Sequence, residues 1–87
     1  MEIDFDDHKN QRNIERRGID FALAAEFDYD SALEIEQTVD GERRHFALGY
    51  IGNRLHALVY VLSGDAIRVI SLRKANKREV KRYEQAS

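Results

Sequence analysis

Three glycine-containing turn signals divide the second half of the chain into four short segments with the composition of β-strands. Such dipeptides favour tight hairpin turns, and they occur at residues 40–41, 52–53 and 64–65. The strands predicted between them cover residues 32–39, 43–51, 54–63 and 66–72. Because strands joined by such short turns are antiparallel neighbours, the sequence predicts a four-stranded antiparallel meander. The third segment is apolar on both faces through its middle, which is typical of a central strand.

The residues before the meander predict a short edge strand and two helices. Residues 2–5 alternate between polar and apolar side chains, as a short strand does. Asp6 can cap a helix that runs through Arg17 and stops at Gly18. The next helix, over residues 21–27, is apolar nearly all round and is therefore expected to be buried in the core.

A third helix follows the meander. Asn76 with Glu79 three residues later is a helix start, and this helix is expected to continue through Tyr83. The fold class predicted for residues 1–87 is a single α+β domain in which the helices cover one face of the sheet. The residues expected in its core are Phe21, Ala24, Phe27, Leu48, Leu58, Tyr60, Ile70 and Val80.

The composition excludes several classes of protein. The chain has 87 residues, enough for one small core, and no cysteine, so neither a disulfide framework nor thiolate chemistry is expected. Its first ten residues lack the basic start and apolar run of a signal peptide. The longest apolar run, residues 57–62, is too short to span a bilayer. The expectation is a soluble, cytoplasmic protein.

The small net charge of −2 conceals two halves of opposite sign. Residues 1–42 hold four basic and thirteen acidic residues, whereas residues 43–87 hold ten basic and three acidic residues. The basic surplus is concentrated in residues 66–83, which favours an acidic partner such as a nucleic acid. A pI near 5.9 argues for a local binding site rather than a basic surface over the whole protein.

Arginine is the residue type with the clearest chemical role. Arg44, Arg68 and Arg73 lie on strands expected in one sheet, and a guanidinium group suits bidentate binding of a phosphate or of a phosphorane-like transition state. His45 and His56 lie on neighbouring strands and could face each other, although a pair of surface histidines is a simpler interpretation than an acid–base pair. No spacing of histidine or carboxylate residues predicts a metal site.

Arg68 and Arg73 are five residues apart, so on a regular strand they point to opposite faces. Both can reach one phosphate only if the strand bends, bulges or ends between them, near residues 71–72. Otherwise one arginine serves the site and the other is structural, and Arg68 is then favoured for the site. The competing explanation for Arg68 is an ion pair to Glu42 or Glu84.

The first predicted helix offers a second polar face. Lys9, Asn13 and Arg17 lie four residues apart and therefore share one side of this helix. They could help to build a phosphate site, or they could belong to a solvated helix that Ile14 pins to the core. The pattern alone favours the solvated helix.

Five groups of residues, spread over nearly the whole chain, form a family pattern. They are Phe5-Asp6-x-x-Lys9-x-x-x-Asn13, Arg17-Gly18-Ile19-x-Phe21-x-x-Ala24, Glu42-x-Arg44 with Gly49, Arg68-x-Ile70-Ser71-x-Arg73-Lys74-Ala75 and Glu79-x-x-x-Tyr83-Glu84. With these groups the chain resembles the BrnT family, small ribonuclease toxins of type II toxin–antitoxin systems with a RelE-like fold. The family usually has tryptophan in place of Phe5 and histidine in place of Arg17. The second change removes a group able to exchange protons near neutral pH.

The resemblance implies a cytoplasmic endoribonuclease that needs no metal or cofactor. It also implies a hetero-oligomer with a cognate antitoxin, a BrnA-like DNA-binding protein, and no membrane partner. In such an enzyme a 2′-hydroxyl attacks the neighbouring phosphate in line, while cationic side chains stabilise the added negative charge. The residues expected to do so are Arg68 and Arg73, with Lys9 and Arg44 as helpers. The residues expected to bind RNA are Lys74, Lys77, Arg78 and Lys81.

Several alternatives stay open on the sequence alone. The general base could be His45, Glu42 or a carboxylate on the first helix. The chain could also be a non-catalytic nucleic-acid-binding module that uses the same basic residues, or an inactive toxin that only binds its antitoxin.

Overall fold

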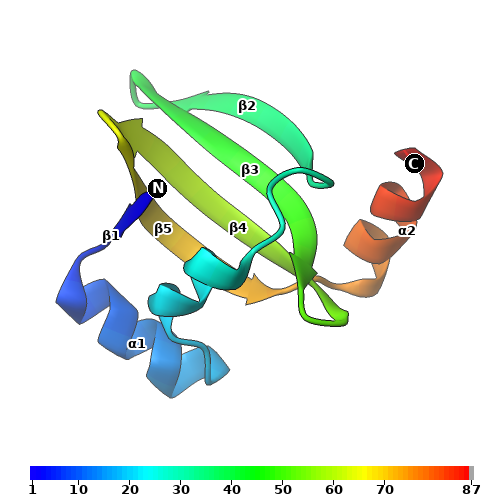
Figure 1. Ribbon diagram of the computed structural model, residues 1–87, viewed down its shortest axis with the longest axis horizontal. Coiled ribbons are helices and arrows are strands. Elements are labelled where there is room, and N and C mark those ends of the chain that lie inside the picture. The colour runs from blue at the N-terminus through cyan, green and yellow to red at the C-terminus, as the bar shows by residue number, and fades with distance from the viewer. Residues whose placement is uncertain (87) are drawn as a thin grey trace.

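The computed structural model describes residues 1–86 as one sheet with helices packed against it (Figure 1). Along these residues the order of the elements is β1 (Glu2–Asp4), α1 (Asp7–Arg17), the 3₁₀ helix η1 (Phe21–Glu26), β2 (Leu33–Val39), β3 (Glu42–Ile51), β4 (Arg54–Ser63), β5 (Ala66–Lys74) and α2 (Lys77–Ala86).

The sheet has five strands in the order β1-β5-β4-β3-β2. Strands β2 to β5 form the predicted antiparallel meander, and β4 is the central strand, as its apolar middle predicts. β1 pairs with β5 in parallel, so the sheet is mixed and contains one strand more than the predicted meander. A tight turn cannot join parallel neighbours, and here α1, η1 and strands β2 to β4 form the connection from β1 to β5.

Helices pack on both faces of the sheet, so the prediction that they cover one face is wrong. The η1 face has a core in which Ala47 and Leu58 pack with residues of η1. The opposite α2 face has a core in which Leu48 and Ala57 pack with Val80 of α2. Because side chains alternate along each strand, neighbouring residues of β3 and β4 contribute to different cores. Of the eight residues expected in the core, six are buried, and Ile70 and Val80 are half-buried.

η1 is less buried than its apolar sequence predicts. Phe21, Ala24 and Phe27 are buried, whereas Leu23 between them is 39% exposed. A 3₁₀ helix has three residues per turn and therefore aligns every third side chain on one side. The prediction of a helix buried all round is wrong because only this one row reaches the sheet.

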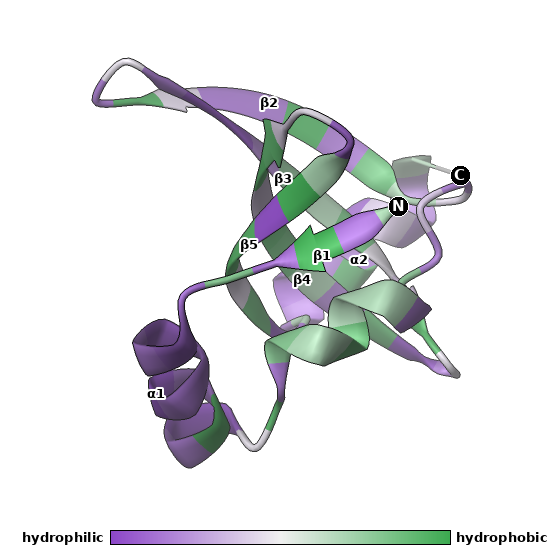
Figure 2. Ribbon diagram, turned by 60° about the vertical axis from the view of Figure 1, so that its left-hand side comes forward, coloured by the Kyte–Doolittle hydropathy of each residue, from purple (hydrophilic) through white to green (hydrophobic). Residues whose placement is uncertain are grey.

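α1 begins and ends where the sequence predicts. The side chain of Asp6 accepts hydrogen bonds from the backbone N–H groups of His8 and Lys9, and Gly18 ends the helix with a left-handed backbone, φ 70°. The bond from Lys9 is the main cause that lowers the pKa of the Asp6 carboxyl group. The helix is hydrophilic over most of its surface (Figure 2). None of the helices within residues 1–86 is long and apolar enough to cross a bilayer.

Asn13, rather than Ile14, anchors α1 to the rest of the protein. Its buried side-chain amide donates to the backbone oxygens of Ile19 and Leu72, at 2.9 and 2.8 Å, while Ile14 is only half-buried. The pairing of β1 with β5 ends at Arg68. Beyond that point the side-chain amide of Asn13 donates to the backbone oxygen of Leu72 on β5. The interpretation of a helix pinned by Ile14 is therefore wrong.

Gly49 on β3 allows η1 and the segment after it to approach the sheet closely. A Cβ atom at this position would lie 2.5 Å from Cζ of Phe27, far inside normal contact distance. We expect Gly49→Ala to lower the free energy of unfolding by about 1–3 kcal/mol, measured by chemical denaturation. Phe27→Leu should then cost less in the Gly49→Ala chain than in the wild type, because the smaller side chain relieves the overlap. Equal costs in both chains would contradict this account.

Candidate nucleic-acid interface

A β-bulge in β5 places Arg68 and Arg73 on the same face of the sheet. Ser71 pairs with Val59 of β4 and the next paired residue is Val69, so Ile70 has no opposite residue on β4. This extra residue shifts the alternation of side chains by one position. Arg68 consequently pairs with Val61 of β4, and Arg73 pairs with Ala57. These two β4 residues are four positions apart, so both arginines lie on the same face of the sheet, the α2 face. The sequence predicted that Arg68 and Arg73 can reach one phosphate only if the strand bends, bulges or ends between them, and this bulge meets that condition.

The α2 face also presents a half-buried apolar floor next to these arginines. Ile35, Phe46 and Val59 pair with one another across β2, β3 and β4, and Ser71 of β5 completes the row. All four side chains are half-buried, because α2 covers the neighbouring row that includes Leu48. The result is a strip of sheet surface on which an aromatic ring can stack.

Two arginines border this floor on the side away from α2. Arg44 lies on β3 two residues from Phe46, and Arg68 lies on β5. Nε of Arg44 is 3.0 Å from Oε1 of Glu42, and Nη1 of Arg68 is 3.1 Å from Oδ2 of Asp4 on β1. The acid beside Arg68 is thus Asp4, which the sequence did not single out. Exposed pairs of this kind contribute only about 0–1 kcal/mol to stability, so an incoming anion can replace either carboxylate at little cost.

Arg73 is held more firmly than the other two arginines. Its guanidinium group donates to both carboxylate oxygens of Glu79, at 2.7 and 2.9 Å. Glu79 also accepts a hydrogen bond from the backbone N–H of Asn76, whose side chain caps the N–H of Glu79. The bonds from Arg73 lower the pKa of Glu79, and the same bonds raise the pKa of Arg73. Arg73 therefore ties the end of β5 to the start of α2.

This pairing predicts a pH-dependent contribution to stability. We expect Glu79→Gln to lower the free energy of unfolding at pH 7 by about 1.5–3 kcal/mol, since it removes charged hydrogen bonds. The folded pKa of Glu79 lies below its usual 4.5, so the contribution is complete above pH 4.5 and is lost as the pH falls through the folded value. Denaturation at several pH values should show the difference from wild type shrinking below pH 4.5. Glu26→Gln, at an exposed position, serves as the control.

The other expected RNA-binding and helper residues lie away from this floor. Lys77, Arg78 and Lys81 are exposed on α2, which turns Val80 toward the sheet. Lys74 is exposed at the end of β5. Among the contacts recorded for residues 1–86, none of these cations touches Arg44 or Arg68.

Lys9 and Arg17 lie on α1, which contacts the edge of β5 through Asn13. Both side chains are exposed. The three side chains on this helix face therefore differ, since the amide of Asn13 in the middle is buried and the cation on either side is exposed. No contact within the described part of the chain joins Lys9 to the arginines of the α2 face.

The two strand residues among the candidates for the general base lie on opposite faces of the sheet. Glu42 lies on the α2 face beside Arg44. His45 lies on the η1 face, where its ring stacks on Tyr60 with the centroids 5.0 Å apart. Nδ1 of His45 is 4.0 Å from Oε1 of Glu34, which also accepts the hydrogen bond that the Tyr60 hydroxyl donates. The sheet itself separates this group from the arginines.

The two strand histidines do not face each other. His45 pairs with Tyr60 and His56 pairs with Gly49, four positions away along the hairpin. The interpretation of a facing histidine pair is therefore wrong. His56 is buried, and its Nδ1 lies 2.9 Å from the backbone oxygen of Arg54.

Tyr29 completes the aromatic group on the η1 face. Its ring meets that of Tyr60 edge-on at 6.3 Å, and its hydroxyl donates to the backbone oxygen of Ala24 at 2.7 Å. Burial, and to a smaller extent the charge of Glu34, raises the pKa of Tyr29 to about 12. Tyr29 is therefore protonated near neutral pH and acts as a structural hydrogen-bond donor.

No local pattern in the sequence marks the floor of the α2 face as a binding surface. Alternation marks Ile35 as a residue of a half-buried strand, and Phe46 and Val59 lie on predicted strands as well. These side chains are uncovered because α2 packs over the neighbouring row, and the position of this helix is a matter of tertiary structure. No group of three or more histidine, aspartate or glutamate side chains within residues 1–86 is arranged to hold a metal ion.

Comparison with known proteins connects this arrangement to a family. A family model described as the ribonuclease toxin BrnT of type II toxin–antitoxin systems matches residues 5–79. The chain belongs to the BrnT family. Membership makes it a ribonuclease toxin by family and implies an antitoxin as its partner.

A solved BrnT structure supports the same assignment. The crystal structure of the ribonuclease toxin BrnT from Brucella abortus is similar to this chain, with a TM-score of 0.72 and 32% sequence identity. The alignment covers 88% of this chain and 99% of the Brucella protein. A search of curated proteins gives no match.

Proposed function

We propose that this BrnT-family chain is a metal-independent endoribonuclease that binds its substrate on the α2 face. Arg44 and Arg68 hold the scissile phosphate there, and a neighbouring base stacks on Phe46 and the adjoining floor. Arginine suits this role because its fork matches two phosphate oxygens, and aromatic rings stack on bases of any sequence.

One observation supports this proposal above the others. Arg44 and Arg68 lie on one face beside a half-buried apolar floor, and each is paired with one exposed carboxylate. A phosphate bound to such an arginine replaces a weak ion pair by a charge-assisted bidentate contact. The two arginines can therefore bind the phosphate of a nucleotide while the adjoining apolar floor contacts its base.

The chemistry requires a new bond from the 2′-oxygen to phosphorus and cleavage of the bond from phosphorus to the 5′-oxygen. The 2′-hydroxyl loses its proton and the 5′-oxygen gains one, leaving a 2′,3′-cyclic phosphate and a 5′-hydroxyl. Glu42 is the proposed base, because its carboxylate becomes available when Arg44 turns from it to the phosphate. Each arginine that donates to the phosphorane contributes about 2–4 kcal/mol, by analogy with oxyanion-hole donors.

The remaining expected residues receive supporting roles in this proposal. Arg73 positions α2 through Glu79. The exposed cations Lys74, Lys77, Arg78 and Lys81 attract the RNA backbone, and Lys9 stays outside the site. The fold is proposed to be RelE-like. The proposed setting is the cytoplasm, with a BrnA-like DNA-binding protein as the antitoxin.

The experiment is cleavage of purified RNA by the purified protein in the presence of EDTA. We expect fragments that end in a 2′,3′-cyclic phosphate and begin with a 5′-hydroxyl, identified by mass spectrometry. Binding of RNA without cleavage would instead indicate a nucleic-acid-binding module. Failure to bind or cleave RNA would leave only the role of binding an antitoxin.

A further inference from the structure

The outer strand β2 leaves one edge of the sheet open. It spans Leu33–Val39 and pairs with β3 on one side, and within residues 1–86 no strand pairs with its other side. At the opposite edge, the side-chain amide of Asn13 donates to the backbone oxygen of Leu72 on β5, beyond the point where β1 ends. Exposed edges in native sheets are usually blocked by proline, by charged side chains (lysine above all) or by a bulge, and the charges on β2 are those of Glu34 and Glu36. β2 contains no proline or lysine, and its register with β3 is continuous.

The two sides of β2 differ in chemistry. Glu34 and Glu36 point to the η1 face, and both are exposed. Leu33 and Ile35 point to the α2 face, and both are half-buried. A strand added along this edge would therefore have carboxylates beside it on one face and aliphatic side chains on the other.

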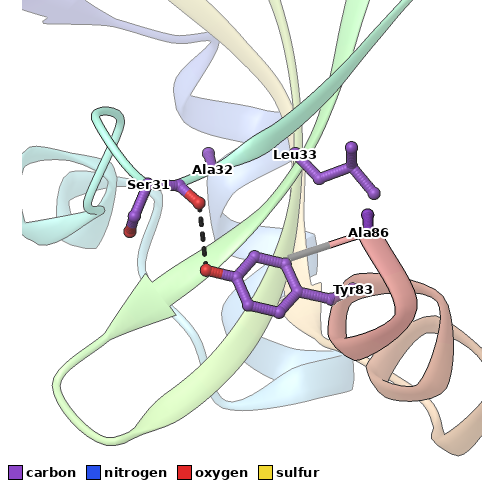
Figure 3. A pocket seen from close by; sticks show the side chains of 5 residues that line it. All are labelled: Ser31, Ala32, Leu33, Tyr83 and Ala86. Carbon is purple, nitrogen blue, oxygen red and sulfur yellow. Dashed lines mark hydrogen bonds between the residues drawn. The ribbon is translucent and has the colours of Figure 1, made fainter.

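A small hollow lies where β2 begins. It has a volume of about 110 Å³ and is lined by Ser31, Ala32, Leu33, Tyr83 and Ala86 (Figure 3). The hydroxyl of Tyr83 donates to the backbone oxygen of Ser31 at 2.9 Å, which holds α2 beside the start of the strand. The hollow is of a size to accept one aliphatic side chain.

A second copy of this chain is a poor occupant of the open edge. Antiparallel pairing of the whole of β2 with itself places Glu36 opposite Glu36, and a shift of two residues in one direction places Glu34 opposite Glu36. Like charges directly opposite one another destabilise a pair of strands. A strand with lysine or arginine opposite Glu34 and Glu36 would instead form pairs of opposite charge, which stabilise two neighbouring strands.

We propose that the edge of β2 binds an extended basic segment of a partner protein by strand addition. The segment alternates lysine or arginine, facing Glu34 and Glu36, with aliphatic residues on the side of Ile35, and one aliphatic side chain enters the hollow beside Tyr83. Backbone hydrogen bonds supply affinity, and the alternating side chains supply specificity. The antitoxin that BrnT membership implies is a partner able to supply such a segment.

The test uses the whole protein and a nine-residue peptide that alternates lysine with valine. We expect binding to protect the outward amides of residues 33–39 from hydrogen exchange and to shift their NMR signals. Peptides with glutamate in place of lysine, or serine in place of valine, should bind at least about tenfold more weakly. Glu36→Lys should weaken binding by a similar factor, whereas Glu15→Lys on α1 has the same charge change and should not.

Three results would overturn the inference. These are absence of binding, signal changes confined to surfaces away from β2, and equal binding by the Glu36→Lys and Glu15→Lys proteins. The binding is measured without RNA, and Glu36 lies on the face opposite Arg44 and Arg68. A failure of strand addition is therefore distinguishable from a failure of the proposed ribonuclease activity.

Discussion

Replacing Arg44 and Arg68 together by glutamine is expected to lower kcat/KM for RNA cleavage by at least about 1,000-fold. Each side chain is proposed to donate to the phosphate in the transition state, where loss of one donor costs about 2–4 kcal/mol. The Arg68→Lys variant keeps the charge but loses the bidentate fork, and we expect it to lose about tenfold or more. Rates measured at subsaturating RNA compare the variants directly.

Stability and charge controls distinguish this role from a structural one. The pairs Arg44–Glu42 and Arg68–Asp4 are exposed, so the double variant should change the free energy of unfolding by no more than about 1–2 kcal/mol. Arg78→Gln removes a charge from the exposed surface of α2 and should reduce cleavage far less. If Arg68→Lys lowers stability and leaves the cleavage rate of the folded fraction intact, Arg68 is structural.

Leu58→Ala is expected to lower the free energy of unfolding by about 2–5 kcal/mol. Leu58 has no exposed surface, lies on the central strand β4 and pairs with Ala47 and Leu72 in the η1-face core. At about 4–8 °C for each kcal/mol in a domain of this size, the melting temperature should fall by roughly 8 °C or more. Thermal denaturation followed by circular dichroism measures this shift.

Leu62→Ala provides a control on the same strand. Leu62 is 63% exposed, so the same change of side chain there should alter stability by no more than about 0.5 kcal/mol. Similar melting temperatures for the two variants would show that burial of Leu58 does not stabilise the fold in the way described.

The local signals in the sequence predicted much of the fold. The turns at residues 40–41, 52–53 and 64–65 gave the antiparallel meander, and Asp6 and Gly18 gave both ends of α1. These features depend on backbone conformation and hydrogen bonds within a few residues, which the amino acids at those positions largely determine. The family was also recognisable from residues spread over the chain.

The position of each functional side chain was less predictable. The sequence placed Arg68 and Arg73 on one strand but could only state that a bulge would bring them to one face. It could not predict that Glu79 would bind Arg73, or that His45 would lie on the face opposite Arg44. The Arg73–Glu79 pair depends on how the chain turns from β5 into α2, and the faces of the other side chains depend on the register between strands.

The sequence by itself determined the strand segments, the turns, the helix caps and the family of this protein. Only the tertiary structure decided that Ile70 is the unpaired residue, that Asn13 bonds the backbone of β5 and that α2 leaves the floor around Phe46 open. The physical reason is that turns and caps are stabilised by neighbouring residues. The bulge, the bond from Asn13 to β5 and the exposed floor instead follow from how two cores, one on each face of the sheet, pack at the same time.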